Sequence, residues 1–187
     1  MFVSIGFKEW ALVCAALGRG EQSILLRKGG IAEGREGFRF RHPEFFLFPT
    51  LFHEQVERTR LPRSTPLPAQ VPGQIHIRWF ARVEWTELVT DRTLVRRLKP
   101  FHILAPSVVE ERFRYEDSEG IHIAFLRVFE LVNPWEFEDL PSFGGCRSWL
   151  ELPDPPADSG MKPVLDDPAH AARGEELRRA LGQLAEV

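Results

Sequence analysis

An alternation of apolar and polar residues over positions 74–85 is the clearest pattern in the chain. Ile75, Ile77 and Trp79 alternate with His76 and Arg78, and a period of two residues is typical of a strand with one buried face. Positions 121–132 are apolar almost throughout, which predicts a strand buried on both faces. Shorter strands are expected over residues 22–27, 38–41, 44–48 and 148–152. Together these segments predict one central sheet.

Helical patterns lie before, between and after these strands. Phe7, Trp10, Cys14 and Leu17 share one face of a predicted helix that Gly18 would end. Further helices are expected over residues 50–58, 90–98, 107–114 and 169–186. The third of these begins with the Ser-x-x-Glu spacing of a capping box, and the last carries its leucines on one stripe. Residues 60–73 are rich in proline, so we expect a long loop there.

The order of these elements predicts an α+β fold. We expect a mixed, strongly curved sheet or a small β-barrel, with short helices at its ends and an amphipathic C-terminal helix. Residues 1–152 form the single core domain in this prediction. Residues 153–168 are rich in Pro, Asp and Gly and form a linker, and residues 169–187 hold the C-terminal helix. This helix is expected to dock on the core or on a second copy of the chain, which would form a homodimer.

Composition narrows the class of protein. Hydrophobic residues make up 43% and charged residues 27% of the 187 positions, which is ordinary for a soluble globular protein. No apolar run reaches the length of a membrane span, and two cysteines without CxxC spacing indicate a reducing compartment. We therefore expect a soluble, cytoplasmic protein with no membrane partner. A net charge of −3 argues against non-specific coating of nucleic acid but is compatible with a local basic face.

Two cations and two glycines follow the strand predicted at residues 22–27. Arg27 and Lys28 stand directly before Gly29 and Gly30. Glycines let the backbone approach a ligand closely, and an arginine forks onto a phosphate. The segment is not a P-loop, because the spaced glycines and the Lys-Ser/Thr ending are missing. These four residues are candidates for ligand binding, and the alternative is a solvated turn beside an edge strand.

Histidines and carboxylates near the next apolar segment suggest a second chemistry. A small metal-dependent hydrolase, nuclease-like, would draw its catalytic residues from His42, His53, Glu54 and Glu110. No HExxH or comparable ligand spacing is present, and the capping box accounts for Glu110, so we predict neither a metal nor a cofactor. His53 is instead expected to line the pocket of Arg27, together with the two residues Arg147 and Trp149 near the last core strand.

Five blocks of the chain resemble, in order, an uncharacterised bacterial family, the domain of unknown function 1802. The blocks are residues 8–11 (KEWA), 25–31 (LLRKGGI), 48–53 (FPTLFH), 109–113 (VEERF) and 144–152 (GGCRSWLEL). The resemblance covers about residues 5–152 and implies a single-domain bacterial protein. It brings no known activity and no catalytic residue.

A second resemblance, in layout only, is to small PUA-like and ASCH-type β-barrels. These barrels place a Trp-containing helix before a glycine-rich turn and a strand that ends in Arg, and residues 6–20 and 22–27 are similar. The resemblance implies a PUA-like barrel that binds RNA or modified bases, and some of these barrels cleave nucleic acid. Likeness of fold does not by itself establish function.

The leading hypothesis is therefore a nucleic-acid- or nucleotide-binding module, with RNA, DNA or a free nucleotide as its partner. The alternatives are the small metal-dependent hydrolase and a non-catalytic protein that binds a protein partner. Whether the protein is an enzyme stays open at this point.

Overall fold

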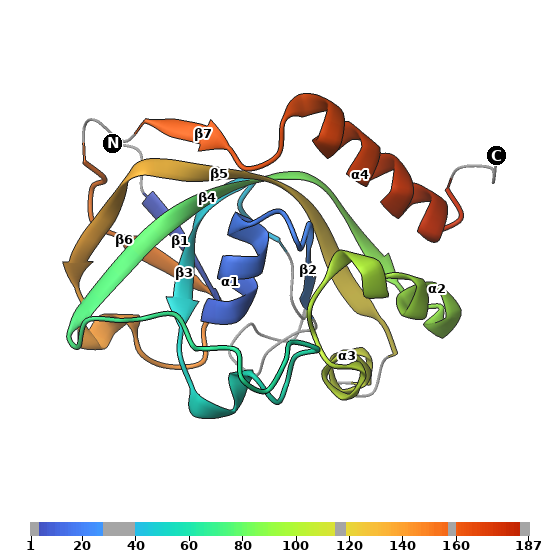
Figure 1. Cartoon of the computed structure of the whole chain (residues 1–187), viewed down its shortest axis with the longest axis horizontal. Helices are drawn as coiled ribbons and strands as arrows, with labels where there is room; N and C mark the ends of the chain where they lie inside the picture. The colour runs from blue at the N-terminus through green and yellow to red at the C-terminus, as the bar shows by residue number, and fades with distance from the viewer. Residues whose placement is uncertain (1–3, 28–39, 115–118, 157–159, 184–187) are drawn as a thin grey trace.

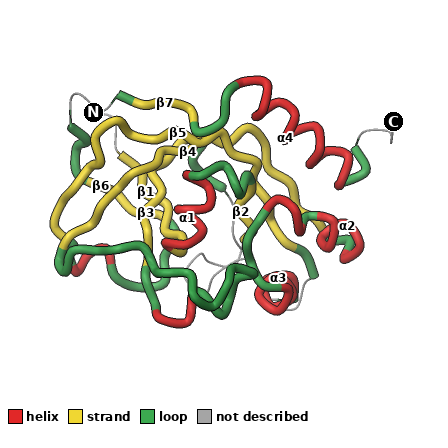
Figure 2. Tube along the Cα trace, in the orientation of Figure 1, coloured by secondary structure: helices red, strands yellow, loops and turns green. Residues whose placement is uncertain are grey.

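A computed structural model describes residues 4–27, 40–114, 119–156 and 160–183. Within these ranges one mixed sheet has the strand order β2-β5-β4-β3-β1-β6, and β7 pairs with β5 outside this path (Figure 1, Figure 2). The strands are β1 (Ser4–Trp10), β2 (Ile24–Arg27), β3 (Glu44–Thr50), β4 (Gln74–Val89), β5 (Ile121–Glu138), β6 (Trp149–Leu152) and β7 (Met161–Pro163). The predicted α+β fold with a curved mixed sheet is confirmed. In the described chain β2 and β6 do not pair with each other, so the sheet is not closed into a barrel.

The long antiparallel pair β4 and β5 gives the sheet its curvature. The register of this pair shifts near Ile77 and again near Val83, and such irregularities bend a strand and increase its twist. The β4–β5 ribbon therefore curves over the helix α1 (Ala11–Gly18) (Figure 1). On the other side of β4, strand β3 runs parallel to β1, which is the pairing that makes the sheet mixed.

The first helix differs from its prediction. Phe7 and Trp10 belong to strand β1, and the helix α1 begins only at Ala11. Residues 11–17 are all buried, because α1 lies inside the curve of the sheet (Figure 1). A helix surrounded by the core has no polar face, so the predicted amphipathic pattern was wrong here. The helix does end at Gly18.

The segment after β3 differs as well. A helix was expected over residues 50–58, but Thr50 is the last residue of β3 and only the short turn η2 (His53–Gln55) is helical. Parallel pairing with β1 extends β3 through Pro49 and Thr50, so tertiary contacts override the local signal. Phe40 and Arg41 are not in a strand, and the rest of the strand predicted at 38–41 lies outside the described residues. Residues 60–73, all of them described, form the expected loop.

Short helices cover the end of the sheet near β2: α2 (Arg92–Arg97), η3 (Lys99–Phe101) and α3 (Pro106–Phe113) (Figure 1). Asp91 caps α2, because its carboxylate accepts a hydrogen bond from the Thr93 backbone N–H at 2.7 Å. The capping box predicted at Ser107 is wrong, since Ala105 is the N-cap of α3 and its side chain makes no capping bond. A further turn, η4 (Pro141–Phe143), precedes β6.

The C-terminal segment packs on the outer side of β4 and β5 (Figure 1). Strand β7 lies within the predicted linker and pairs with β5. In α4 (Asp167–Ala180), Leu177 is buried in the main core, as is Leu181 just after the helix. His170 stacks on Phe125 with ring centroids 4.8 Å apart. The helix thus docks on the core of its own chain, which was one of the two expectations, while the domain boundaries stay a prediction. Across the described ranges, no helix is long and apolar enough to cross a membrane.

Candidate ligand-binding pocket

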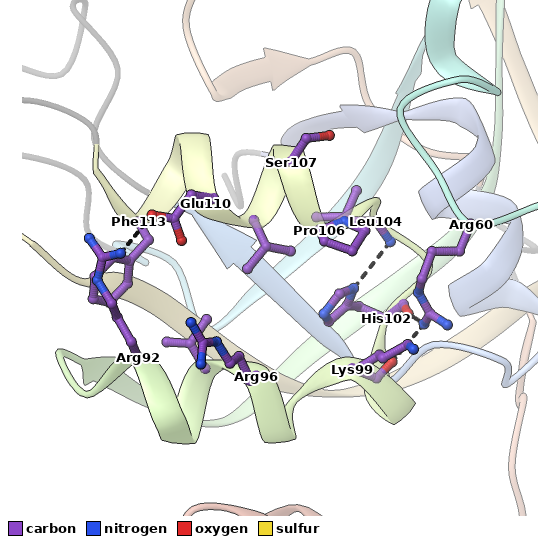
Figure 3. A pocket seen from close by; sticks show the side chains of 12 residues that line it. Arg60, Arg92, Arg96, Lys99, His102, Leu104, Pro106, Ser107, Glu110 and Phe113 are labelled. Atoms are coloured by element: carbon purple, nitrogen blue, oxygen red, sulfur yellow. Dashed lines mark hydrogen bonds and ion pairs between the residues drawn. The ribbon is translucent and has the colours of Figure 1, made fainter.

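The helices α2 and α3 and the turn η3 enclose a pocket of about 480 Å³ (Figure 3). We call it the α2–α3 pocket. Its lining combines four cations, one carboxylate, a histidine, a serine and an apolar group: Arg60, Arg92, Arg96, Lys99, Glu110, His102, Ser107, Val95, Leu104, Pro106, Val109 and Phe113. This volume lies in the range of pockets that hold small organic ligands. The lining suits a ligand with one anionic part and one apolar part.

Two of the four cations are already engaged within the protein. Arg92 contacts the Glu110 carboxylate at 2.8 Å and the Glu119 carboxylate at 2.5 Å. Arg60 donates hydrogen bonds to the backbone oxygens of Lys99, at 2.6 Å, and of His102. By contrast, the side chains of Arg96 and Lys99 are exposed and form no ion pair with any described residue. These two cations are therefore available to an anion.

The wall of the pocket that carries His102 is held by hydrogen bonds on both sides. The Ile103 backbone N–H donates to Gln22 Oε1 at 3.0 Å, and Gln22 is itself buried. The Ser23 N–H donates to the Phe101 oxygen at 3.2 Å, and the Arg60 N–H donates to the Ile103 oxygen at 2.7 Å. Because these bonds fix the backbone before a ligand arrives, binding would cost little ordering of this wall.

His102 is the most deeply placed polar residue of the pocket, with 4% of its surface exposed. Burial lowers the pKa of this histidine to about 3, and the positive charges of Arg60 and Arg112 add to the effect. The imidazole is therefore neutral at physiological pH. It acts there through hydrogen bonds and does not supply positive charge.

A second hollow, of about 610 Å³, lies beside β6 and gathers three residues that the sequence singled out. His42, Arg147 and Trp149 all line it, and the rings of His42 and Trp149 meet edge to face with centroids 4.9 Å apart. The described residues that line it include one arginine, Arg147, and one carboxylate, Glu151. This hollow is therefore less positive than the α2–α3 pocket.

Arg27 lines neither of these pockets. Its Nε lies 3.7 Å from Glu9 Oε2, and its terminal nitrogen donates to the Lys8 backbone oxygen. The guanidinium also covers the ring of Phe7, 4.8 Å from its centroid. A phosphate at Arg27 would have to compete with these internal contacts. Lys28, Gly29 and Gly30 lie outside the described residues, so their predicted role in ligand binding remains a prediction.

The four residues proposed for metal-dependent catalysis are placed at different points of the molecule. His42 lines the hollow beside β6, whereas Glu110 lines the α2–α3 pocket. His53 and Glu54 are exposed on η2. Within the part of the chain that the structure describes, no three His, Cys, Asp or Glu side chains gather closely enough to hold a metal ion.

The sequence did carry a signal for the α2–α3 pocket. Arg92, Arg96 and Lys99 follow the spacing i, i+4 and i+7, which places residues on one face of a helix. The helix was expected, but its basic face was not followed to a site. His102 and Arg60 could not have been added from spacing alone, because they reach the pocket through the packing of separate segments (Figure 3).

Fold and pocket together define an α+β protein with one open, curved sheet and a basic pocket at one end. The chain belongs to the family described as Domain of unknown function (DUF1802), whose model matches residues 6–176. The match includes β7 and most of α4, and so extends past the residues that carried the sequence resemblance. None of the curated proteins matches the chain.

Solved structures of an ASCH protein from Zymomonas mobilis are similar to the chain. A serine-to-alanine mutant of that protein has a TM-score of 0.50 at 13% identity and covers 93% of this chain and 95% of its own. The crystal structure of ASCH from the same organism has a TM-score of 0.47 at 16% identity, over 80% of this chain and 87% of that one. The first comparison shows an ASCH-like fold, in agreement with the second resemblance seen in the sequence.

Proposed function

We propose that this protein is a nucleic-acid- or nucleotide-binding module that holds phosphate in the α2–α3 pocket. The observation that carries the proposal is the presence of two cations, Arg96 and Lys99, without ion-pair partners among the described residues, beside a pocket of about 480 Å³. A phosphate oxygen accepts charge-assisted hydrogen bonds from such groups. Nucleic acids and nucleotides are common ligands that join a phosphate to a flat ring with apolar faces and polar edges.

The rest of the lining supports the same ligand class. Arg92 lies over the ring of Phe113, with its guanidinium carbon 5.0 Å from the ring centroid, so the wall already pairs a cation with an apolar surface. Stacking of bases on flat side chains and contacts from basic residues to phosphate are the two usual components of single-strand binding. The net charge of −3 argues against binding over the whole surface and is compatible with binding at this local site.

The test is fluorescence anisotropy with labelled single- and double-stranded RNA and DNA, at several salt concentrations. Arg96→Ala and Lys99→Ala are each expected to weaken binding about tenfold and to reduce the slope of log affinity against log salt by about one. Arg178→Ala is the matched control, because Arg178 is an exposed arginine in the last turn of α4 just as Arg96 is in the last turn of α2. Absence of binding, or equal binding by all three variants, would overturn the proposal.

Denaturing gels of the same labelled strands, incubated with and without Mg²⁺, separate the two alternatives. Shortening of a labelled strand that requires Mg²⁺ would favour the metal-dependent hydrolase, with His42, His53, Glu54 or Glu110 as the residues to substitute next. If the anisotropy of the labelled strands does not change at any salt concentration, the result would favour a protein that binds a protein partner. The preference for RNA over DNA is proposed from the resemblance to ASCH-type domains. Competition between unlabelled RNA and DNA for the site would test this preference.

We also propose a cytoplasmic location. Cys14 is buried and Cys146 is exposed, and both are free thiols, which is the usual state of cysteines in a reducing compartment. A bacterial source is proposed on the family resemblance alone. Homodimer formation through α4 stays a prediction, and size-exclusion chromatography coupled to light scattering would test it.

A further inference from the structure

One nitrogen of the buried His102 ring has a fixed partner and the other has none in the described chain. The Leu104 backbone N–H donates a hydrogen bond to His102 Nδ1 at 3.1 Å (Figure 3). A neutral imidazole whose Nδ1 accepts carries its proton on Nε2, so we assign this tautomer from the hydrogen bond. The Nε2–H is left as a donor in the lining of the α2–α3 pocket.

The position of this donor is set before any ligand binds. His102 lies between Phe101, whose oxygen accepts from the Ser23 N–H, and Ile103, whose N–H donates to Gln22. The Arg60 side chain donates to the His102 oxygen as well. With the backbone and the Nδ1 side both held, the ring has little freedom to turn. Such a preorganised polar group in a mostly apolar pocket is the usual means of selecting a ligand.

We infer that His102 selects the ligand of the α2–α3 pocket by donating its Nε2–H to an acceptor atom of a nucleobase, while Arg96 and Lys99 hold the phosphate of the same nucleotide. This inference rests on the proposed function and narrows its ligand class to a single unpaired nucleotide, either free or at an accessible position in a strand. A duplex does not fit, because its bases are stacked and paired, and a pocket of about 480 Å³ has room for one nucleotide. The apolar residues Val95 and Leu104 then face the base rather than the phosphate.

Burial supports this division of labour between His102 and the cations. A charged histidine would add to phosphate binding, but the lowered pKa of His102, about 3, keeps the ring neutral. Its role is then to match hydrogen-bonding groups, and a ligand that lacks an acceptor at this point leaves a buried donor unsatisfied. Leaving a buried polar group without a partner is the stronger source of discrimination in such sites.

Two substitutions separate the two nitrogens of the ring. In His102→Asn, the amide oxygen takes the place of Nδ1 and keeps an acceptor for the Leu104 N–H, but the donor at Nε2 is lost. In His102→Gln, the amide nitrogen reaches the place of Nε2 and keeps the donor, but the acceptor for Leu104 is lost. Thermal denaturation of both variants checks that each is folded, and Arg178→Ala again serves as the unrelated control.

Calorimetric titration with the common ribonucleoside 5′-monophosphates and with ribose 5-phosphate tests the inference. His102→Asn is expected to weaken the tightest-bound monophosphate about tenfold and to leave ribose 5-phosphate unchanged, while His102→Gln binds both nearly as the wild type does. Lys99→Ala weakens both ligands. Equal binding by His102→Asn and wild type, or loss of both ligands alike in the Asn variant, would overturn the role of His102.

The outcomes for the wild type distinguish this inference from the proposed function. If the wild-type protein binds labelled RNA or DNA but none of the monophosphates, the single-nucleotide site is wrong and the proposed function stands. If it binds neither, the proposed function has failed and the inference fails with it.

Discussion

The carboxylate of Glu9 lies 3.7 Å from the guanidinium Nε of Arg27, in the interior of the protein. Glu9 has only 1% of its surface exposed, and its second charged neighbour, Arg112, approaches the other oxygen to 3.9 Å. The Trp10 backbone N–H donates to the same oxygen at 2.8 Å. One buried carboxylate thus balances two arginines, and it joins the end of β1 to β2 and α3.

Removal of the Glu9 charge is expected to destabilise the fold strongly. Glu9→Gln keeps the size of the side chain but removes the buried carboxylate that lies beside both Arg27 and Arg112, whose side chains are only 20% and 14% exposed. Breaking a buried ion pair from one side typically costs about 3–5 kcal/mol. Burial lowers the pKa of Arg112 to about 10, although the charge of Glu9 raises it. Loss of the Glu9 charge therefore makes the charged form of Arg112 less stable in the folded protein. Chemical denaturation measures the free energy of unfolding.

Glu111→Gln is the matched control for the Glu9 variant. Glu111 is an exposed glutamate that pairs with Arg58 at 2.5 Å, and exposed pairs contribute about 0–1 kcal/mol. A similar loss of stability in the two variants would contradict the view that burial, rather than ion pairing as such, makes Glu9 important.

Gly18 is expected to tolerate no side chain. A Cβ at this position would lie 2.1 Å from Cε2 of Trp79 on β4, so Gly18→Ala requires the indole or the end of α1 to move. Overpacking of a core costs about 1–3 kcal/mol, and thermal denaturation would show it as a lower Tm. Gly160→Ala is the control, since its Cβ would meet Val132 at an ordinary 3.4 Å. An equal loss of stability in this control would contradict the steric argument.

The strands could be predicted because their patterns coincide with their surroundings. In β4, Ile75 and Ile77 face the core and His76 does not, so the alternation in the sequence reports the fold directly. The first helix could not be predicted in the same way. Phe7 and Trp10 have helical spacing, but in a segment buried on nearly every side the spacing of apolar residues no longer distinguishes strand from helix. The burial of Glu9 could not be predicted either, because this residue lies in the same segment.

The candidate site was predictable only in part, for a related reason. Local spacing places Arg92 and Arg96 on one face of a helix, and this can be predicted from the sequence. The convergence of Arg60 and His102 on the same pocket depends on the loop that follows η2 and on the turn after η3. Long-range packing of this kind produces no periodic pattern in the sequence. Trp149 was expected beside Arg27 and His42 in a separate catalytic group, but the two residues line one hollow together, and Arg27 does not line it.

The packing of α4 predicts the behaviour of a truncated leucine. Leu177 is fully buried against the core of its own chain, and a Leu→Ala change at such a position costs about 2–5 kcal/mol. Leu177→Ala should therefore lower the Tm without changing the molecular mass measured by light scattering. Val132→Ala, at a position 62% exposed on β5, should change neither. Dissociation of a dimer by the Leu177 variant would contradict docking of α4 on its own chain.

His102 makes the stability of the protein depend on pH. Burial lowers its pKa from an ordinary 6.5 to about 3 in the folded state, so between these values the unfolded chain binds a proton that the folded protein does not. The free energy of unfolding contributed by His102 is thus fully present above about pH 6.5 and is lost as the pH falls toward 3. Between about pH 6 and about pH 4 the expected loss is about 2 kcal/mol.

His102→Asn isolates this contribution, because asparagine does not titrate and keeps an acceptor for the Leu104 N–H. Other groups, among them the half-buried His170, whose pKa burial also lowers, titrate equally in both proteins and cancel in the difference. Urea denaturation at a series of pH values should show the wild type losing stability faster than the variant as the pH falls. Parallel curves would mean that the pKa of His102 in the folded protein stays close to its ordinary value of 6.5. The ring would then be a cation in mildly acidic solution, and its part in ligand binding would be attraction of phosphate rather than the matching of a neutral donor.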